Sequence, residues 1–126
     1  GLRADDRLRV VDPMGYVDFL SLVRGAALVV TDSGGIQEET TILDVPCLTM
    51  RPNTERPITI SHGTNRLVGP TEVVAAAREI LAGPIRPSGP RPPLWDGHAG
   101  ARIADEIVAW LGTGTRPAAE ATGTTR

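Results

Sequence analysis

The sequence predicts an α/β fold with a parallel β-sheet flanked by helices. Short apolar runs of strand length alternate with segments in which apolar residues recur every three or four positions, and this alternation is typical of βαβ units. The clearest strand is AALVV at residues 26–30, because an unbroken apolar run of this length indicates a parallel strand that is buried on both faces.

The other elements follow from spacing and from turn residues. Residues 8–11 form an apolar run that predicts a first strand, which Asp12 and Pro13 end. The remaining predicted elements, in chain order, are a helix at 15–24, the strand at 26–30, a helix at 35–43, a strand at 45–50, a helical turn at 57–62, a strand at 66–68 and helices at 71–81 and 99–111. We expect the helix at 35–43 to bury Ile36, Ile42 and Leu43.

Composition places the chain among soluble, globular proteins. Its 126 residues suffice for one small domain, 40% of them are hydrophobic and the net charge is -2. We find neither an apolar run of membrane-spanning length nor a secretory leader, so we expect a cytoplasmic protein without a membrane partner. The sequence contains no basic patch with interleaved aromatic residues, so we expect no binding to nucleic acid. Cys47 is the single cysteine, which excludes an internal disulfide, and its apolar surroundings predict a buried residue.

The segment TDSGGIQEE, residues 31–39, predicts an anion site. It follows the clearest strand and begins a helix. The first turn of a helix has backbone N–H groups without an intrahelical partner, and the helix dipole favours negative charge there. Gly34 and Gly35 let a phosphate approach the backbone because they carry no Cβ, and Glu39 offers a carboxylate to ribose hydroxyls. These features indicate a sugar nucleotide or a nucleoside diphosphate.

Each residue of this segment also has an ordinary structural interpretation. Ser33 could be the N-cap of a tight strand-to-helix turn, and Asp32 is expected to orient the loop, since no second carboxylate or histidine stands at metal-ligand spacing. Glu38 and Glu39 could be solvated acids of the first helical turns. Glu39 is favoured as the ribose ligand because it lies one turn from Gly35 on the same face.

Outside this segment the pattern leaves two interpretations open. Arg56 follows the strand at 45–50, and could form a weak surface pair with Glu55 or bind a phosphate as a fork. His62 and His98 are single histidines without triad-like neighbours, and are expected in loops.

Four segments together resemble the C-terminal half of the non-hydrolysing UDP-N-acetylglucosamine 2-epimerases: DSGGIQEE, DVPCLTMRPNTERP, HGTNRLVG and PPLWDGHAG. The resemblance runs over residues 8–111. It implies part of a two-domain GT-B-type fold, in which two Rossmann-like domains face each other across a cleft. It also implies that UDP-N-acetylglucosamine and UDP-N-acetylmannosamine are interconverted for surface polysaccharides, by elimination and re-addition of UDP. No cofactor is expected.

The resemblance implies a UDP site made of Ser33, Gly34, Gly35, Glu39, Arg56 and Phe19, with Asp32 and Glu38 in support. The amides of the Ser-Gly-Gly turn would hold the diphosphate, Glu39 would accept hydrogen bonds from the ribose, and Arg56 would reach the cleft near the diphosphate. Phe19, otherwise a core residue of its helix, would lie against the uracil. Met14 stands where the family usually has a glutamine that contacts uracil.

The chain is expected to have four parts. The resemblance implies that residues 1–82 are the UDP-binding part of the C-terminal domain. Composition and apolar spacing predict a Pro/Gly-rich connector at 83–98, a C-terminal helix at 99–111 and a disordered tail at 112–126. The family's acid and base carboxylates lie in the N-terminal domain, so this chain would contain no catalytic residue and would be inactive without that domain. The parent protein is expected to be a homodimer. Two alternatives remain, a donor-binding piece of a GT-B glycosyltransferase and a non-catalytic remnant that only binds UDP.

Overall fold

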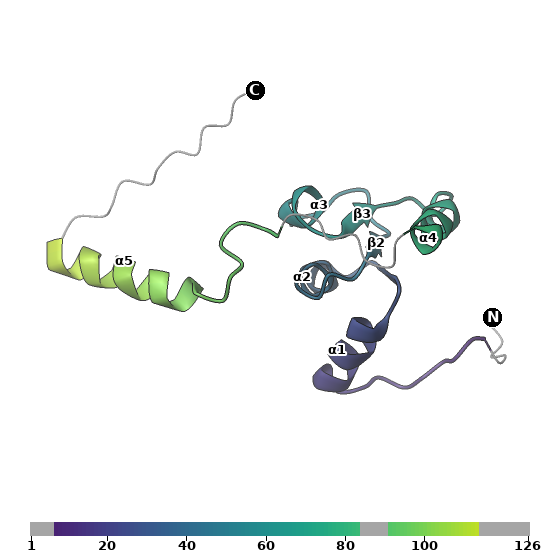
Figure 1. The fold of residues 1–126 in the computed structure, drawn as a ribbon, viewed down its shortest axis with the longest axis horizontal. Helices are drawn as coiled ribbons and strands as arrows, with labels where there is room; N and C mark the ends of the chain where they lie inside the picture. The colour runs from purple at the N-terminus through teal and green to yellow at the C-terminus, as the bar shows by residue number, and fades with distance from the viewer. Residues whose placement is uncertain (1–6, 84–90, 114–126) are drawn as a thin grey trace, which may run out of the picture. The chain divides into compact units, whose positions relative to one another are not determined.

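The computed structural model describes residues 7–83 and 91–113 of a chain that divides into two units, residues 1–92 and 93–126. The first unit contains, in order, α1 (Tyr16–Gly25), β1 (Val29–Thr31), α2 (Gly34–Ile42), β2 (Cys47–Thr49), α3 (Ile58–Ser61), β3 (Asn65–Leu67) and α4 (Val73–Ala82) (Figure 1). The second unit contains α5 (Ala99–Thr113).

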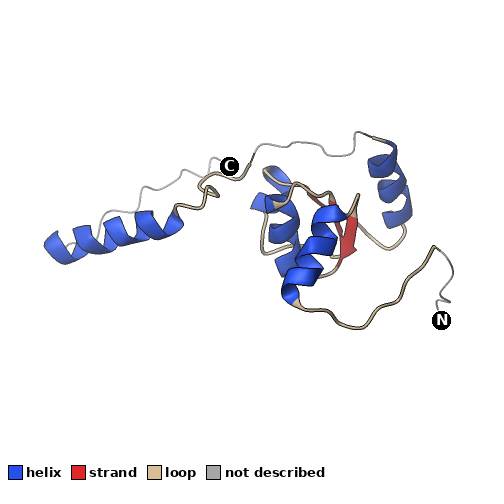
Figure 2. Cartoon of the chain, turned by 60° about the horizontal axis from the view of Figure 1, so that its bottom comes forward, coloured by secondary structure: helices blue, strands red, loops and turns tan. Residues whose placement is uncertain are grey.

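The three described strands form one parallel sheet in the order β1-β2-β3. Val29 pairs with Cys47, and Cys47 pairs with Asn65. Helices lie on both sides of the sheet (Figure 2). The predicted α/β fold with a parallel sheet is therefore confirmed. Because all strands run the same way, the loops after β1, β2 and β3 emerge at one edge.

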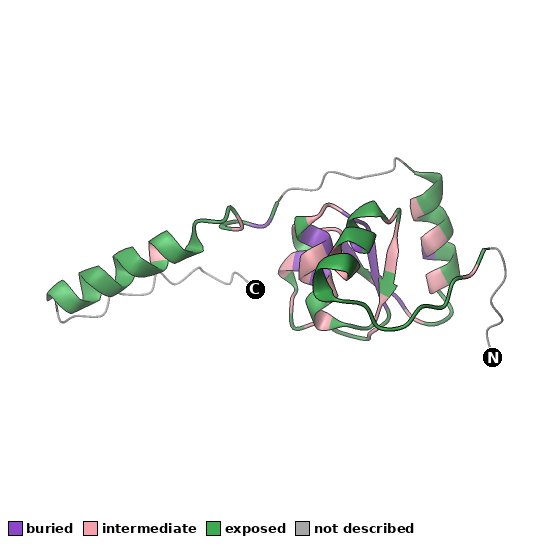
Figure 3. Cartoon of the chain, turned by 90° about the horizontal axis from the view of Figure 1, so that it is seen from below, coloured by how far each residue is buried: buried purple, intermediate pink, exposed green. Residues whose placement is uncertain are grey.

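One face of the sheet has an apolar core. Leu48 of β2 packs with Val68 and Ala76, and half-buried apolar residues surround them: Leu28, Val73, Ala77 and Ile80. Figure 3 shows α4 on one side of the sheet and α2 on the other. Since side chains alternate along a strand, Leu48 faces α4, whereas Cys47 and Thr49 face α2.

The opposite face is polar, and this corrects the prediction for α2. The residues that α2 buries are Gln37, Thr40 and Thr41, whereas Ile36 and Leu43 are only half-buried and Ile42 is 63% exposed. Burial is possible here because the polar atoms have partners: the hydroxyl of Thr40 donates to Ile36 O (2.8 Å) and that of Thr41 donates to Gln37 O (2.7 Å).

Two strand predictions were also wrong in part. Residues 8–11 form no strand, and apart from a single bridge at Leu8 they find no partner strand in the described part of the chain; Val10 and Val11 are exposed. The strand predicted at 26–30 is shorter and is not buried on both faces, because β1 is the edge strand of the described sheet and Val30 is 47% exposed.

The second unit is described by α5 and the segment before it. Asp96 accepts hydrogen bonds from Arg102 (2.7 and 3.0 Å) and from the N–H of His98 (3.0 Å). Large apolar residues of α5 are exposed: Ile103, Ile107, Val108 and Leu111. Within the predicted connector, residues 84–90 lie outside the described residues, as do residues 114–126 of the predicted tail.

Candidate functional site

The candidate site lies at the edge of the sheet where β1 and β2 end. The chain leaves β1 at Thr31 and enters α2 at Gly34. Ser33 has the extended backbone of an N-cap residue, but its side chain makes no capping hydrogen bond. Its own N–H donates to the hydroxyl of Thr31 (3.0 Å), which fixes the turn. Within the described part of the chain, no side chain caps the first turn of α2, so its amide groups remain available to an anion.

The two glycines of the turn differ in their surroundings. A Cβ on Gly35 would have no neighbour within 4 Å, so the space beside its Cα is open. A Cβ on Gly34 would lie 2.8 Å from Nη1 of Arg56 and 3.8 Å from Nη1 of Arg51. The structure therefore brings the predicted Arg56 directly against the helix terminus. Arg51 is a cationic residue at this site that the sequence analysis missed.

Both arginines are held by acidic side chains. Nε of Arg56 lies 2.9 Å from Oε2 of Glu38, and its Nη1 lies 3.7 Å from Oε2 of Glu55. Arg51 donates to both carboxylate oxygens of Glu55 (3.1 and 3.2 Å). The four side chains are between 30% and 61% exposed, and solvated ion pairs of this kind contribute little. The guanidinium groups can therefore turn from carboxylate to phosphate at small cost.

Glu39 projects from α2 toward α1. Its Oε2 is buried and has no hydrogen-bond partner among the described residues, although buried carboxylate oxygens are normally satisfied. The pKa of the exposed Tyr16 phenol is raised, first by its hydrogen bond to Glu39 and then by desolvation and the carboxylate charge. Phe19 is half-buried and follows Tyr16 by three residues, so both lie on one face of α1. The predicted ribose and uracil ligands thus lie on two helices that contact each other.

The other residues named from the sequence lie in different settings. Asp32 is exposed in the turn, and Met14 is exposed before α1. Cys47 is fully buried in β2, as predicted. His62 is half-exposed after α3 and pairs with the neighbouring Ser61, and His98 is exposed before α5.

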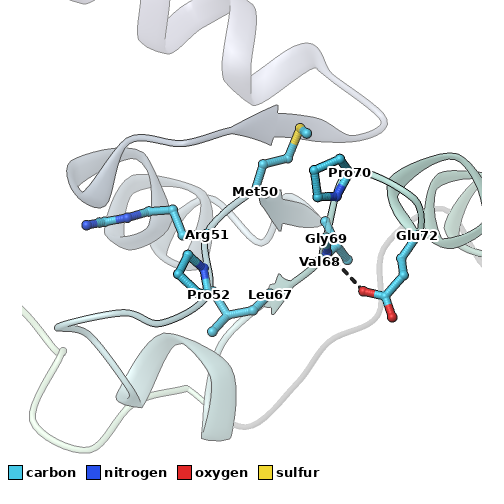
Figure 4. Close-up of a pocket in the computed structure, with 8 residues that line it drawn as sticks. All are labelled: Met50, Arg51, Pro52, Leu67, Val68, Gly69, Pro70 and Glu72. Atoms are coloured by element: carbon cyan, nitrogen blue, oxygen red, sulfur yellow. Dashed lines mark hydrogen bonds between the residues drawn. The ribbon is translucent and has the colours of Figure 1, made fainter.

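A cavity of about 470 Å³ opens beside the site, where β2 and β3 end (Figure 4). It is lined by Met50, Arg51, Pro52, Leu67, Val68, Gly69, Pro70 and Glu72. The carboxylate of Glu72 accepts a hydrogen bond from the N–H of Gly69 (2.9 Å). The side chain of Arg51 points away from the cavity (Figure 4). The sequence signal for this cavity is the loop that directly follows each apolar strand, since ligands of open α/β sheets bind beyond the carboxyl ends of the strands.

Among the described residues, no three His, Cys, Asp or Glu side chains lie together so that they could hold a metal ion. None of the described helices is long and apolar enough to cross a bilayer. What the geometry offers is a set of amide groups at a helix terminus, two arginines and a carboxylate, which together suit the phosphates and the ribose of a nucleotide.

Comparison with known proteins agrees with this chemistry. The sequence model of the UDP-N-acetylglucosamine 2-epimerase family matches residues 2–108. The UDP-N-acetylglucosamine 2-epimerase of Methanocaldococcus jannaschii is 44% identical over 103 residues, which are 81% of this chain and 28% of that protein. The UDP-2,3-diacetamido-2,3-dideoxy-D-glucuronate 2-epimerase of Pseudomonas aeruginosa is 38% identical over 103 residues, 80% of this chain and 28% of the relative.

Solved structures show the same fold. The M. jannaschii epimerase in complex with UDP-GlcNAc and UDP superimposes with a TM-score of 0.70 at 38% identity, over 84% of this chain and 29% of that one. The complex of S. aureus MnaA with UDP gives a TM-score of 0.74 at 31% identity, over 90% of this chain and 32% of that one. The chain thus spans less than a third of the length of these relatives. It belongs to the UDP-N-acetylglucosamine 2-epimerase family.

Proposed function

We propose that this chain forms the UDP-binding part of the C-terminal domain of an epimerase that interconverts UDP-N-acetylglucosamine and UDP-N-acetylmannosamine. The observation that carries the proposal is the position of Arg56 against Gly34, at a helix terminus that no side chain of the described residues caps. Amide dipoles and a planar guanidinium converge there, as a diphosphate requires.

Each part of the nucleotide has a matching group. The amides of Ser33, Gly34 and Gly35 would bind the diphosphate together with Arg56. The buried, unpaired Oε2 of Glu39 would accept a hydrogen bond from a ribose hydroxyl, which would satisfy it. Phe19 would stack against the uracil, and Asp32 and Glu38 would support the turn and the arginine.

The names of the relatives support an assignment to UDP rather than to the sugar. One relative acts on UDP-N-acetylglucosamine and another on a diacetamido glucuronate derivative. The two substrates share UDP and differ in the sugar, so the part that this chain has in common with both proteins is suited to UDP. We propose that the acid and base that move the C2 proton, and the sugar contacts, belong to the part of the relatives that this chain does not span. These 126 residues alone would bind UDP without epimerisation.

A titration of the chain with UDP and with uridine, followed by NMR chemical shifts, tests this proposal. Replacing Gly34 with valine should lower the affinity for UDP by about tenfold and leave uridine unaffected, because the side chain displaces Arg56 and screens the amides. Glu39→Ala should lower the affinities for UDP and uridine by a similar factor, since both molecules carry the ribose. Glu79→Ala, an exposed glutamate of α4, is the control.

Unchanged UDP affinity in both Gly34→Val and Glu39→Ala would refute the site. Epimerisation by the complete gene product without an acceptor would separate an epimerase from a glycosyltransferase, and a product that binds UDP without turnover would identify a remnant.

A further inference from the structure

A closed ring of hydrogen bonds runs through the buried polar face and includes the backbone of Arg56. The hydroxyl of Thr54 donates to Oε1 of Gln37 (2.6 Å) and accepts from the N–H of Arg56 (3.0 Å). On the other side, the carbonyl of Arg56 accepts from the hydroxyl of Thr59 (2.8 Å), which accepts from Nδ2 of Asn65 (3.2 Å). Asn65 closes the ring by donating to Oε1 of Gln37 (3.0 Å). Both backbone polar groups of Arg56 are therefore fixed.

The side chain of Gln37 connects this ring to the turn before α2. Its Nε2 donates to the carbonyl of Ser33 (3.3 Å), while its Oε1 carries the two bonds of the ring. Gln37 is fully buried. Its bond with Asn65 is buried, and its bonds with Ser33 and Thr54 are partly buried, so water competes little for them. A neutral amide can act as donor and acceptor at once, and a carboxylate at this position could not donate to Ser33.

We propose that Gln37 is a positioning residue, which holds Arg56 at the distance from Gly34 that lets guanidinium and amides bind the same diphosphate. This inference rests on the proposed function. Gln37 touches no ligand; it acts through the loop of Thr54 and Arg56. Gln37 should therefore contribute to the binding affinity for the phosphates and not to the binding of the ribose or the uracil.

A purely structural role for Gln37 gives a different pattern. If the ring only stabilised the fold, its loss would lower the affinity for UDP and for uridine by the same factor, or change neither affinity. If it positions Arg56, its loss lowers the affinity for UDP but not for uridine, and the loss disappears once the guanidinium is removed.

The test is a double-mutant cycle on the 126-residue chain with UDP and uridine as probes, followed by NMR titration. Gln37→Met keeps the length of the side chain and removes all three hydrogen bonds. We expect UDP to bind about tenfold more weakly and uridine to stay within about twofold. Arg56→Ala should show a similar loss, and adding Gln37→Met to Arg56→Ala should cause no further loss.

Two further variants protect the test against a folding defect. Thr54→Val breaks the same ring at a half-buried loop residue and should reproduce the UDP-specific loss of affinity. Thr40→Val removes a buried hydroxyl of α2 that lies outside the ring, and should leave the ratio of UDP to uridine affinity unchanged.

The outcomes separate the two proposals. If the chain binds UDP and Arg56→Ala weakens it, but Gln37→Met and Thr54→Val do not, the positioning role is refuted and the UDP site stands. The positioning role is also refuted if Gln37→Met lowers the affinities for UDP and uridine equally, or if the losses of UDP affinity add up in the double variant. If the unaltered chain does not bind UDP, both proposals fail.

Discussion

The two faces of the sheet are buried in different ways. Toward α4, Leu48 packs among aliphatic side chains and makes no directional contact. Toward α2, residues such as Gln37 and Asn65 are buried just as deeply, but are held by hydrogen bonds of defined geometry. Apolar burial is insensitive to direction and supplies stability, whereas a satisfied polar network fixes positions. The apolar face therefore supports the fold, and the polar face places the site.

The largest effect should come from the apolar face. Leu48→Ala leaves a cavity under α4 and should lower the free energy of unfolding by about 2–5 kcal/mol, measured by urea denaturation. Leu22→Ala, at an exposed leucine of α1, should change it by less than about 0.5 kcal/mol. In the folded fraction of Leu48→Ala, the ratio of UDP to uridine affinity should stay unchanged. A change in that ratio would contradict the division between the two faces.

The next effect should come from the polar face at Gly63. A Cβ there would lie 2.5 Å from both Oγ1 of Thr41 and the carbonyl of Thr59, and neither backbone nor buried side chain can move freely. Gly63→Ala should cost about 1–3 kcal/mol of unfolding free energy, since overpacking forces the backbone to shift. Gly25→Ala, where no atom lies within 4 Å, serves as the matched control. Equal stability of the two variants would show that α3 yields to the methyl group.

Cys47 reports on the polar face without a change of sequence. Burial raises the pKa of this thiol, and the thiolate is the reactive form. Modification by a thiol reagent at pH 8 should therefore be at least about a hundredfold slower in the native chain than in urea, because it requires opening of the structure. Gln37→Met should accelerate the native reaction more than Leu22→Ala does. Rapid labelling of the native chain would contradict tight packing between α2 and β2.

The sequence predicted the parts of the structure that local pattern controls. The strand at 45–50 contains β2, whose neighbours on both sides bury it, and the Ser-Gly-Gly turn begins a helix where expected. The strand predicted at 8–11 failed because a strand depends on a partner that the segment itself does not specify. Pattern reasoning also treats apolar residues as the buried ones, so it chose Ile42 over Gln37 as a buried residue of α2.

Long-range pairing explains what could not be predicted at the site. Gln37 and Asn65 are 28 residues apart and satisfy each other only in the folded chain. The sequence left Arg56 between a surface pair with Glu55 and a phosphate ligand. In the structure it pairs with Glu38 and Glu55 and lies against Gly34, and its binding of a phosphate stays a prediction. Arg51 was missed because its approach to the same glycine depends on the loop after β2 folding back toward α2.

The smallest effect should come from an exposed pair that belongs to neither face. Hydrogen bonds from Arg102, and from the N–H of His98, lower the pKa of Asp96 to about 2. Because the pKa in the folded state is below the unfolded value of about 3.9, the stabilisation of the start of α5 is present above that value and is lost as pH falls through about 2. Carboxyl ¹³C shifts of Asp96 and amide shifts of α5 should follow this titration together.

Two variants test the pair. Asp96→Asn should remove the acid-dependent change at α5, and Arg102→Gln should raise the pKa of Asp96. A titration of Asp96 near its ordinary value in the unaltered chain would show that the pair does not form in solution, whereas the affinity for UDP at neutral pH should be the same in all three proteins.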